Sequence, residues 1–370
     1  MGNYVVSARK YRPNSFDSLV GQDVIAQTLK NAIKNDQLAQ AFLFNGSRGV
    51  GKTSAARILA KLINCASRTE NIEACNQCES CRSIDNGNSF NIYELDAASN
   101  NGVEAMRGLT DQVRIPPQIG KYKVYIIDEV HMLSASAFNA FLKTLEEPPS
   151  HAIFILATTE KHKVIPTILS RCQIFDFLRI KIVDIVNHLK HVSEKEGIQV
   201  EDDSLHLIAQ KSDGGMRDAL SIFDQIVSYS GKTISYKDVA DNLNILDYDY
   251  YFKLVECAIT ENIHSSLLIF KEINDRGHDS HQFLVGYSEH FRNLLMCKDT
   301  STIHLLEVSE SIKSSYLEQA NKLEVDFIIR ALGVLASSDS EFKTSLNTKL
   351  HIELTILQLC SIQNELKKKA

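Results

Sequence analysis

The chain has 370 residues, of which 44% are hydrophobic and 23% charged, a composition typical of globular proteins with a sizeable core. Its net charge of −6 argues against a generally basic nucleic-acid binder, so any contact with DNA must come from a local patch or from partners. No apolar run approaches the length of a membrane span, and the N-terminus lacks the apolar core of a signal peptide. We therefore expect a cytoplasmic protein of two or three domains.

The first 40 residues predict either an N-terminal arm that packs on the core or a lid over an adenine ring, and the residues alone favour the arm. Pro13 and the polar cluster around it indicate a loop from Tyr11 to Gln22. A helix follows, and we expect its apolar face to carry Val24, Ile25, Leu29 and Ile33.

Residues 46–53 have the spacing G-x-x-x-x-G-K-T of a phosphate-binding loop. A short apolar run at 41–44 predicts a buried strand before it, and residues 54–62 predict an amphipathic helix after it. Lys52 would reach the β- and γ-phosphates, and the Thr53 hydroxyl would bind Mg²⁺. The alternative, a glycine-rich turn without a ligand, is disfavoured by these flanks. The residues expected to contact the nucleotide here are Gly46, Ser47, Arg48, Gly49, Val50, Gly51, Lys52, Thr53 and Ser54.

Four of the eight cysteines follow at the spacing C-x9-C-x2-C-x2-C: Cys65, Cys75, Cys78 and Cys81. Four thiolates at this spacing can close a tetrahedral site, which predicts structural zinc. A redox C-x-x-C pair or an iron–sulfur cluster is the alternative. The other four, Cys172, Cys257, Cys297 and Cys360, lie in apolar surroundings and are expected to be plain core residues.

Two carboxylates end a predicted buried strand at residues 123–129. Ligands of open α/β sheets bind at such carboxyl ends. Asp128 is placed to hold Mg²⁺, and Glu129 is placed to orient and polarise an attacking water. A solvated acidic pair would be the interpretation favoured in isolation, and the phosphate-binding loop upstream argues against it.

Further strands are expected at residues 90–96, 153–156 and 173–177. The strand at 153–156 ends in polar residues that could sense a γ-phosphate or could simply cap the strand. Arg171 lies just before the last strand, where a lone arginine is usually a surface charge.

From about residue 180 the pattern changes to successive helices, and the region from 244 onward is expected to be all-α. Arg217 lies in the first turn of a helix, an unfavourable place for a cation unless an anion or a salt bridge compensates. The last helix has two apolar stripes, which predict burial on two sides, by more core or by a neighbouring subunit. The two stripes are Leu350, Leu354 and Leu357, and Ile352, Ile356 and Leu359.

Together these segments resemble the gamma/tau subunits of bacterial DNA polymerase III, the ATPase motor of the sliding-clamp loader. The matches run in family order to about residue 225, whereas the C-terminal third matches in length and helical character more than in motif. They are Tyr11-Arg12-Pro13, Gly46 to Ser54, the four cysteines, 124–133, 142–149, 157–159, 169–172 and 216–220.

The resemblance implies an α/β P-loop AAA+ protein. Residues 1–179 would form a RecA-like domain with a parallel sheet of about five strands and a zinc-knuckle insertion at about 64–83. Residues 180–243 would form a small helical lid, and residues 244–370 an all-α collar that gathers five subunits into a ring.

The resemblance also assigns residues and cofactors. Thr159 is similar to the sensor-1 residue, Arg171 to an arginine finger that reaches a neighbour's γ-phosphate, and Arg217 to sensor 2. Val20 and Gly21 would line the adenine pocket. With Lys52, Asp128 and Glu129 these residues imply ATP hydrolysis with Mg²⁺, and the cysteines imply Zn²⁺. The sequence shows no polymerase active site, so polymerisation is expected of the holoenzyme.

The implied partners are delta and delta-prime clamp-loader subunits, the beta sliding clamp, primed DNA and further copies of the chain. Longer members of the family carry domains for the polymerase core and the helicase, which are expected as partners only if a longer form exists.

Two alternative functions remain. One is a non-hydrolysing scaffold subunit, and the other is a different AAA+ DNA remodeller such as a Holliday-junction motor. The intact Lys52, Asp128 and Glu129 argue against the first, and the cysteine knuckle against the second.

Overall fold

The computed structural model describes residues 5–118, 120–244, 246–306, 308 and 310–369. The chain divides into two compact units, the first built from residues 1–196 and 209–225 and the second from residues 197–208 and 226–370. Helices α9 (Asp202–Lys211) and α10 (Met216–Ser230) contribute residues to both units. Among the described residues, no helix is long and apolar enough to cross a membrane.

The first unit is built on a five-stranded parallel sheet with the order β2-β3-β4-β1-β5. Parallel neighbours require crossover connections, and helices supply them on both faces. Because β1 lies between β4 and β5, the loop after β1 opens at a reversal of strand order, where ligands bind in such sheets. The strands are β1 (Ala41–Asn45), β2 (Ile92–Asp96), β3 (Lys123–Asp128), β4 (Ala152–Thr158) and β5 (Gln173–Asp176).

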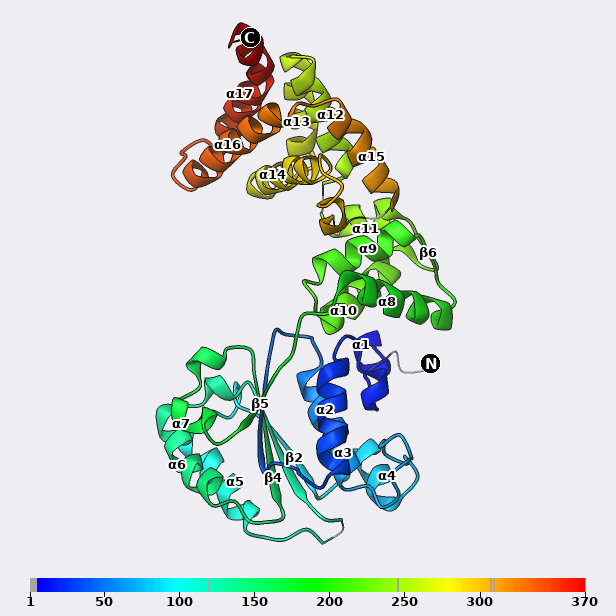
Figure 1. The fold of residues 1–370 in the computed structure, drawn as a ribbon, viewed down its shortest axis with the longest axis vertical. Helices are drawn as coiled ribbons and strands as arrows, with labels where there is room; N and C mark the ends of the chain where they lie inside the picture. Colours follow the sequence, from blue (N-terminus) through cyan, green and yellow to red (C-terminus); the bar gives the residue numbers. More distant parts are fainter. Residues whose placement is uncertain (1–4, 119, 245, 307, 309, 370) are drawn as a thin grey trace. The chain divides into compact units, whose positions relative to one another are not determined.

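Each face of this sheet packs against its own core, and successive side chains of a strand enter the two cores in turn. Phe44 and Ile126 pack in one core with α2 and α3, whereas Leu43 and Ile127 pack in a second core with α5 and α6. Figure 1 shows α2 and α3 on one side of the sheet and α5, α6 and α7 on the other. These helices are α2 (Asp23–Lys34), α3 (Lys52–Ile63), α5 (Val103–Val113), α6 (Ala135–Glu146) and α7 (Pro166–Leu169).

Shorter elements complete the unit. The N-terminal segment forms α1 (Ser7–Lys10) and a 3₁₀ turn, η1 (Phe16–Ser18), and the cysteine-containing insertion ends in α4 (Glu79–Asp85). Two more 3₁₀ turns, η2 (Val130–Met132) and η3 (Lys161–Lys163), follow strands β3 and β4. Helix α8 (Ile182–Glu196) comes after the last strand of the sheet.

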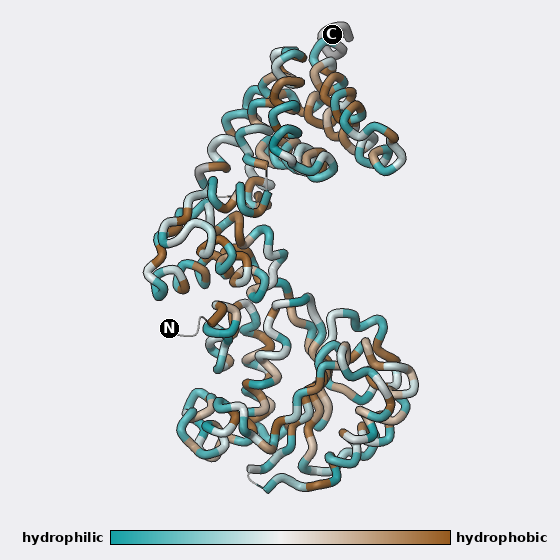
Figure 2. The backbone as a smooth tube through the Cα atoms, turned by 180° about the vertical axis from the view of Figure 1, so that it is seen from behind, coloured by the Kyte–Doolittle hydropathy of each residue, from teal (hydrophilic) through white to brown (hydrophobic). Residues whose placement is uncertain are grey.

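The second unit is helical apart from a two-stranded parallel ladder, and its core is continuous from α12 to α17. Helices α14, α16 and α17 pack on one another, as do α12, α13 and α17. Hydrophobic and hydrophilic residues lie side by side along these helices (Figure 2), so each buries one face. The elements are β6 (Gln199–Val200), β7 (Thr233–Ile234), α11 (Tyr236–Asn242), α12 (Tyr248–Ile259), α13 (Ile263–Asp275), α14 (Ser280–Met296), η4 (Ile303–Leu305), α15 (Glu310–Asn321), α16 (Val325–Phe342) and α17 (Thr348–Lys369).

The predicted fold class is confirmed. Each of the five strands expected in the first unit lies within two residues of its predicted bounds, and the region after residue 244 is helical. The predicted boundaries at residues 179 and 243 stay predictions. One predicted face is wrong. Val24 is 80% exposed, whereas Ile25, Leu29 and Ile33 are buried, because Val24 stands a full 100° step around α2 from that stripe.

The remaining expectations about burial are met in part. Cys297 and Cys360 are buried, but Cys172 and Cys257 are only half-buried. In α17 the stripe of Ile352, Ile356 and Leu359 lies in the core, whereas Leu350 and Leu354 of the other stripe are 49% and 50% exposed. The described residues therefore cover one apolar face of α17 and leave the second apolar face about half exposed.

Candidate nucleotide and metal sites

The loop between β1 and α3 has the backbone of a phosphate cradle. Gly46, Gly49 and Gly51 have φ of 154°, 78° and 104°, in the left-handed region that favours glycine. An added Cβ would lie 2.6 Å from the carbonyl oxygen of Phe177 at Gly46 and 2.8 Å from Cδ1 of Leu19 at Gly51. Helix α3 begins at Lys52, so its free N–H groups and dipole face the loop and favour an anion there.

Lys52 is held at the centre of this loop. Its Nζ donates hydrogen bonds to the carbonyl oxygens of Gly46 at 2.7 Å and Ser47 at 2.8 Å. The side chain is buried, and this burial lowers the pKa of Lys52 even though Glu129 and Asp128 favour its charge. A bound phosphate would therefore place further negative charge beside the Lys52 ammonium group, which has lost part of its hydration.

The end of β3 meets the start of α3 through a side-chain hydrogen bond. Thr53 Oγ1 donates to Asp128 Oδ2 at 2.7 Å, although the two residues are 75 positions apart. Hydroxyl and carboxylate oxygens are ligands that Mg²⁺ accepts. Thr53 and Asp128, the residues predicted to hold Mg²⁺, therefore lie together, and their oxygen atoms are suitable ligands for this ion.

Glu129 stands at the next position in a left-handed backbone conformation, with φ of 48°. Thr159 Oγ1 donates to Glu129 Oε2 at 3.2 Å. His131, which is buried, lies 3.4 Å from the same oxygen through Nδ1 and 3.1 Å from Glu160 Oε2 through Nε2. The ends of β3 and β4 thus form one polar cluster around the Glu129 carboxylate.

The loop from Arg48 to Ser54, together with Asp128 and Glu129, lines a cavity of about 640 Å³, a size typical of ligand sites. Five cationic side chains and three carboxylates line it, so the described lining carries an excess of positive charge that suits a polyphosphate. The predicted residues that line the cavity are Val20, Arg48, Gly49, Val50, Gly51, Lys52, Thr53, Ser54, Asp128, Glu129 and Arg217.

Arg217 reaches the cavity because the start of α10 lies against the phosphate loop. The Arg217 N–H donates to the Gly49 carbonyl at 3.4 Å. A Cβ added at Gly215 would lie 3.0 Å from the Arg48 carbonyl oxygen, so a larger residue there would push the phosphate loop away from α10. The glycines of the Asp213-Gly214-Gly215 segment before α10 therefore allow the start of this helix to lie close to the phosphate loop.

Other predicted residues lie beside the cavity or away from it. Gly21, with φ of 71°, packs against Ile180, and a Cβ there would lie 3.2 Å from Cγ2 of that residue. Thr159 acts on the cavity through Glu129. Arg171 lies outside the cavity and pairs with Glu146 at 2.6 Å, while its Nη1 donates to the Thr167 carbonyl at 2.8 Å.

Sequence reasoning missed three polar residues. Arg12 lines the cavity and donates from Nε to Ser54 Oγ at 3.1 Å, and burial lowers its pKa. Asp96 lines it too, since it ends β2 in register with Asp128. Adjacent ends of predicted strands could have identified Asp96, whereas the role of His131 has no sequence signal that separates it from an ordinary buried histidine.

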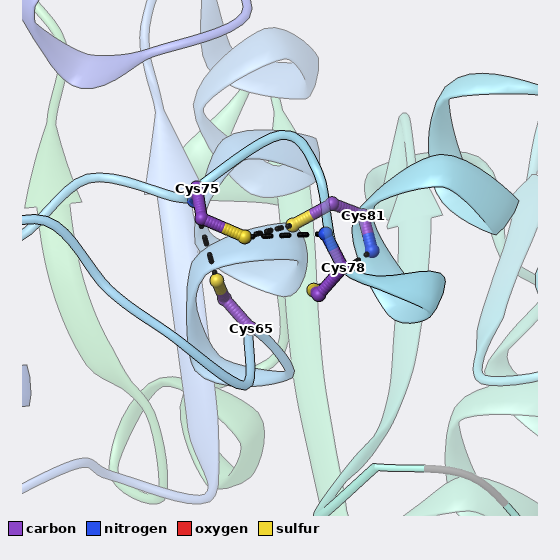
Figure 3. A group of neighbouring side chains, drawn as sticks. All are labelled: Cys65, Cys75, Cys78 and Cys81. Atoms are coloured by element: carbon purple, nitrogen blue, oxygen red, sulfur yellow. Dashed lines mark hydrogen bonds between the residues drawn. The ribbon is translucent and has the colours of Figure 1, made fainter.

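The four cysteines of the insertion converge (Figure 3). Their Sγ atoms all lie within 4.8 Å of one another, and those of Cys75 and Cys81 are 4.0 Å apart. Four sulfurs at about 2.3 Å from a tetrahedral zinc would be roughly 3.8 Å apart, so the cluster fits that ion with a small contraction. None of the four forms a disulfide.

Backbone N–H groups point at these sulfurs. Cys78 N donates to Cys75 Sγ at 3.3 Å, and Cys75 N donates to Cys65 Sγ at 3.3 Å. Donors from Gln77 and Cys78 lower the pKa of Cys75 to about 6, while burial raises that of Cys81. Because such N–H groups stabilise thiolates, and thiolates are the metal-binding form, the donor set suits a cysteine-bound cation.

Comparison with known proteins identifies three successive family matches. Residues 21–181 match DNA polymerase III, delta subunit, and residues 184–232 match the ATPase lid domain of a DNA polymerase III clamp loader subunit. Residues 234–370 match domain III of DNA polymerase III subunits gamma and tau.

Individual relatives agree with these matches. The chain is 39% identical over 363 residues to DNA polymerase III subunit tau of Bacillus subtilis, covering 98% of this chain and 64% of that protein. It is 34% identical to DNA polymerase III subunit gamma of Buchnera aphidicola subsp. Baizongia pistaciae, covering 98% of both chains. The chain thus spans less than two thirds of the tau protein and nearly all of the gamma protein.

Solved structures give a weaker likeness. The Thermotoga maritima RuvB Holliday junction branch migration motor matches with a TM-score of 0.47 and 19% identity, over 67% of this chain and 79% of that one. At this level the likeness carries no argument about whether the chain is a clamp-loader subunit or a Holliday-junction motor.

Proposed function

The chain belongs to the gamma/tau family of DNA polymerase III clamp-loader subunits, and from this premise we propose that it hydrolyses ATP to drive the loading of a sliding clamp onto primed DNA. The observation that carries the proposal is the Thr53–Asp128 hydrogen bond beside Glu129. It joins a phosphate-binding loop to a strand-end carboxylate pair, which is the arrangement that phosphoryl transfer to water requires.

Binding begins at the loop. The backbone N–H groups after β1 and the N-terminus of α3 take the phosphate oxygens, and Lys52 exchanges the Gly46 and Ser47 carbonyls for the β- and γ-phosphates. Val20 and Gly21 are assigned to the adenine side. Arg217 links α10 to the bound nucleotide, because the same helix already contacts the loop at Gly49.

Thr53 and Asp128 would hold Mg²⁺, which supplies charge neutralisation and orientation of the phosphates. Glu129 orients and polarises the attacking water, and Thr159 positions the Glu129 carboxylate through its hydroxyl. The preformed hydrogen bond between Thr159 and Glu129 means that little reorganisation is needed at the reacting end of the cavity.

Arg171 is proposed as a finger that acts in a neighbouring subunit. Its position outside the cavity, with an exposed partner in Glu146, supports a role away from its own site. A cation delivered in this way stabilises the charge of the transition state and is typically worth roughly 10³–10⁵ in rate. The half-exposed stripe of α17 supports contact with another subunit.

The proposed partners are delta and delta-prime subunits, the beta sliding clamp, primed DNA and further copies of this chain in a five-subunit ring. Polymerase core and helicase would join only through a longer form. Zinc on Cys65, Cys75, Cys78 and Cys81 would stabilise the insertion and leave no position for catalysis.

Glu129→Gln tests the proposal against a matched control, the exposed Glu147→Gln at the end of α6. We expect the first variant to bind ATP with wild-type affinity and to lose hydrolysis and clamp loading by at least about a hundredfold, because only the water-activating charge is removed. Glu147→Gln should match the wild type. Hydrolysis in the Glu129 variant at the wild-type rate would refute the assignment, and ATP binding without hydrolysis by the wild type would favour a scaffold subunit.

A further inference from the structure

The loop between the first and second cysteines presents a carboxylate that the nucleotide site does not use directly. Glu73 lies two residues before Cys75, in a turn closed by hydrogen bonds from Thr69 N to Glu73 O at 2.9 Å and from Glu73 N to Thr69 Oγ1 at 3.0 Å. Its side chain is only 12% exposed. A buried carboxylate needs partners, so its contacts show what the loop is fastened to.

Among the described residues, the partners of Glu73 outside its own loop lie in the N-terminal arm and α2. Glu73 Oε2 accepts from the Phe16 N–H at 3.3 Å, and Oε1 accepts from the Asp17 N–H at 3.2 Å. Lys30 Nζ lies 2.7 Å from Glu73 Oε1 and 2.7 Å from Asp17 Oδ1. Burial opposes the charge on Lys30, but the hydrogen bonds that Lys30 donates to Asp17 and Glu73 outweigh it and raise the Lys30 pKa.

These contacts fix a segment that leads directly into the nucleotide cavity. Phe16 and Asp17 begin η1, and the next residues, Ser18, Leu19 and Val20, line the cavity. The Leu19 N–H donates to the Phe16 carbonyl at 3.1 Å, and the Leu19 side chain lies directly over Gly51 of the phosphate loop. Phe16 and Asp17, which contact Glu73, therefore directly precede the cavity wall in the chain.

The same connection exists in the core. Phe16 and Leu19 belong to one cluster of buried side chains with Cys65, Ala74 and Cys81. If the cysteine loop becomes less ordered, both the contacts of Glu73 with the N-terminal arm and the side-chain packing beneath the cavity wall change.

We propose that Glu73 is a positioning residue for nucleotide binding: it transmits the order of the metal-binding cysteine loop to residues 18–20 of the cavity wall. The inference rests on the proposed function and adds to it a purpose for the cysteine site. Coupling of this kind is reciprocal, so zinc on the cysteines raises the affinity for nucleotide, and nucleotide raises the affinity for zinc.

The test compares Glu73→Gln with Glu70→Gln, an exposed carboxylate in the same loop. Glu73→Gln leaves Lys30 its second partner, Asp17, so the fold should persist. The zinc-loaded proteins are titrated with Mg-ADP by calorimetry well below their unfolding temperatures. Zinc affinity is then measured by equilibrium competition with a chromogenic chelator, with and without saturating Mg-ADP. If Glu73→Gln does not fold, Glu73→Asp replaces it, because it keeps the charge but is one methylene too short to reach both amides.

We expect Glu73→Gln to weaken Mg-ADP binding about fivefold or more relative to Glu70→Gln, a typical size for coupling between sites. Mg-ADP should raise the affinity for zinc less in Glu73→Gln than in Glu70→Gln. Equal affinities in the two variants would overturn the inference, even with a lower unfolding temperature for Glu73→Gln, since that result describes a purely structural contact. An equal rise in zinc affinity in the two variants would overturn it too. If the wild type fails to bind Mg-ADP, the proposed function itself fails.

Discussion

Gly51→Ala is predicted to damage the phosphate-binding loop through two separable costs. Gly51 has φ of 104°, and a side chain at such a conformation costs about 1–3 kcal/mol. The new Cβ would also lie 2.8 Å from Cδ1 of the buried Leu19, and overpacking of this kind costs about 1–3 kcal/mol. Together the substitution should cost about 2–6 kcal/mol, relieved only if the loop or the cavity wall moves.

The matched control is Gly108→Ala in α5, where nothing lies within 4 Å of the added Cβ. In a helix this change should be neutral or stabilising by up to about 1 kcal/mol. Thermal unfolding and Mg-ADP titration of both variants measure the difference. We expect Gly51→Ala to unfold several degrees below the wild type and to bind Mg-ADP at least tenfold more weakly. The reasoning is refuted if the two alanine variants behave alike in both assays.

Three further predictions concern charge and metal. Lys52→Met should abolish Mg-ADP binding without lowering the unfolding temperature of the nucleotide-free protein, because burial already disfavours the Lys52 charge. Titration and scanning calorimetry measure the affinity and the unfolding temperature, and a markedly lower unfolding temperature would contradict the prediction. Burial lowers the pKa of His290 from 6.5 to about 4, so stability present above pH 6.5 is lost as the pH falls towards 4, by at most about 3 kcal/mol. Urea unfolding at pH 7.5 and 5 should show a smaller loss for His290→Gln than for the wild type, and equal losses would exclude His290 as the cause. Cys78→Ser should leave less than one bound zinc per chain after dialysis, whereas Cys257→Ser should retain one; metal analysis decides between them.

The sheet and the phosphate loop could be predicted because their signals are local. Strands β1, β3 and β4 are short, largely apolar and buried runs, and the glycines of the loop occupy positions that other residues adopt only with strain. The cysteine cluster was predictable for the same reason, since metal-ligand spacing is a short-range pattern.

What sequence reasoning could not supply depends on contacts between distant segments. Arg12 meets Ser54 across 42 positions, and Glu73 meets Phe16 across 57. Neither pair has a periodicity or a spacing that marks it. The error at Val24 has a related cause: an apolar residue next to a helical stripe was counted with it, although its exposure is decided by what packs against α2.

The most direct test of the account is the steady-state ATPase rate of Lys52→Ala and Arg171→Ala, each alone and co-assembled with the other. We predict that each variant alone is inactive, because one lacks the phosphate contact and the other lacks the finger that serves its neighbour. A co-assembled mixture in equal amounts should recover up to about a quarter of the wild-type rate, since half the sites keep Lys52 and half of those meet an intact Arg171. Wild-type hydrolysis by Arg171→Ala alone would show a self-contained site and would contradict the proposal that active sites are shared between subunits.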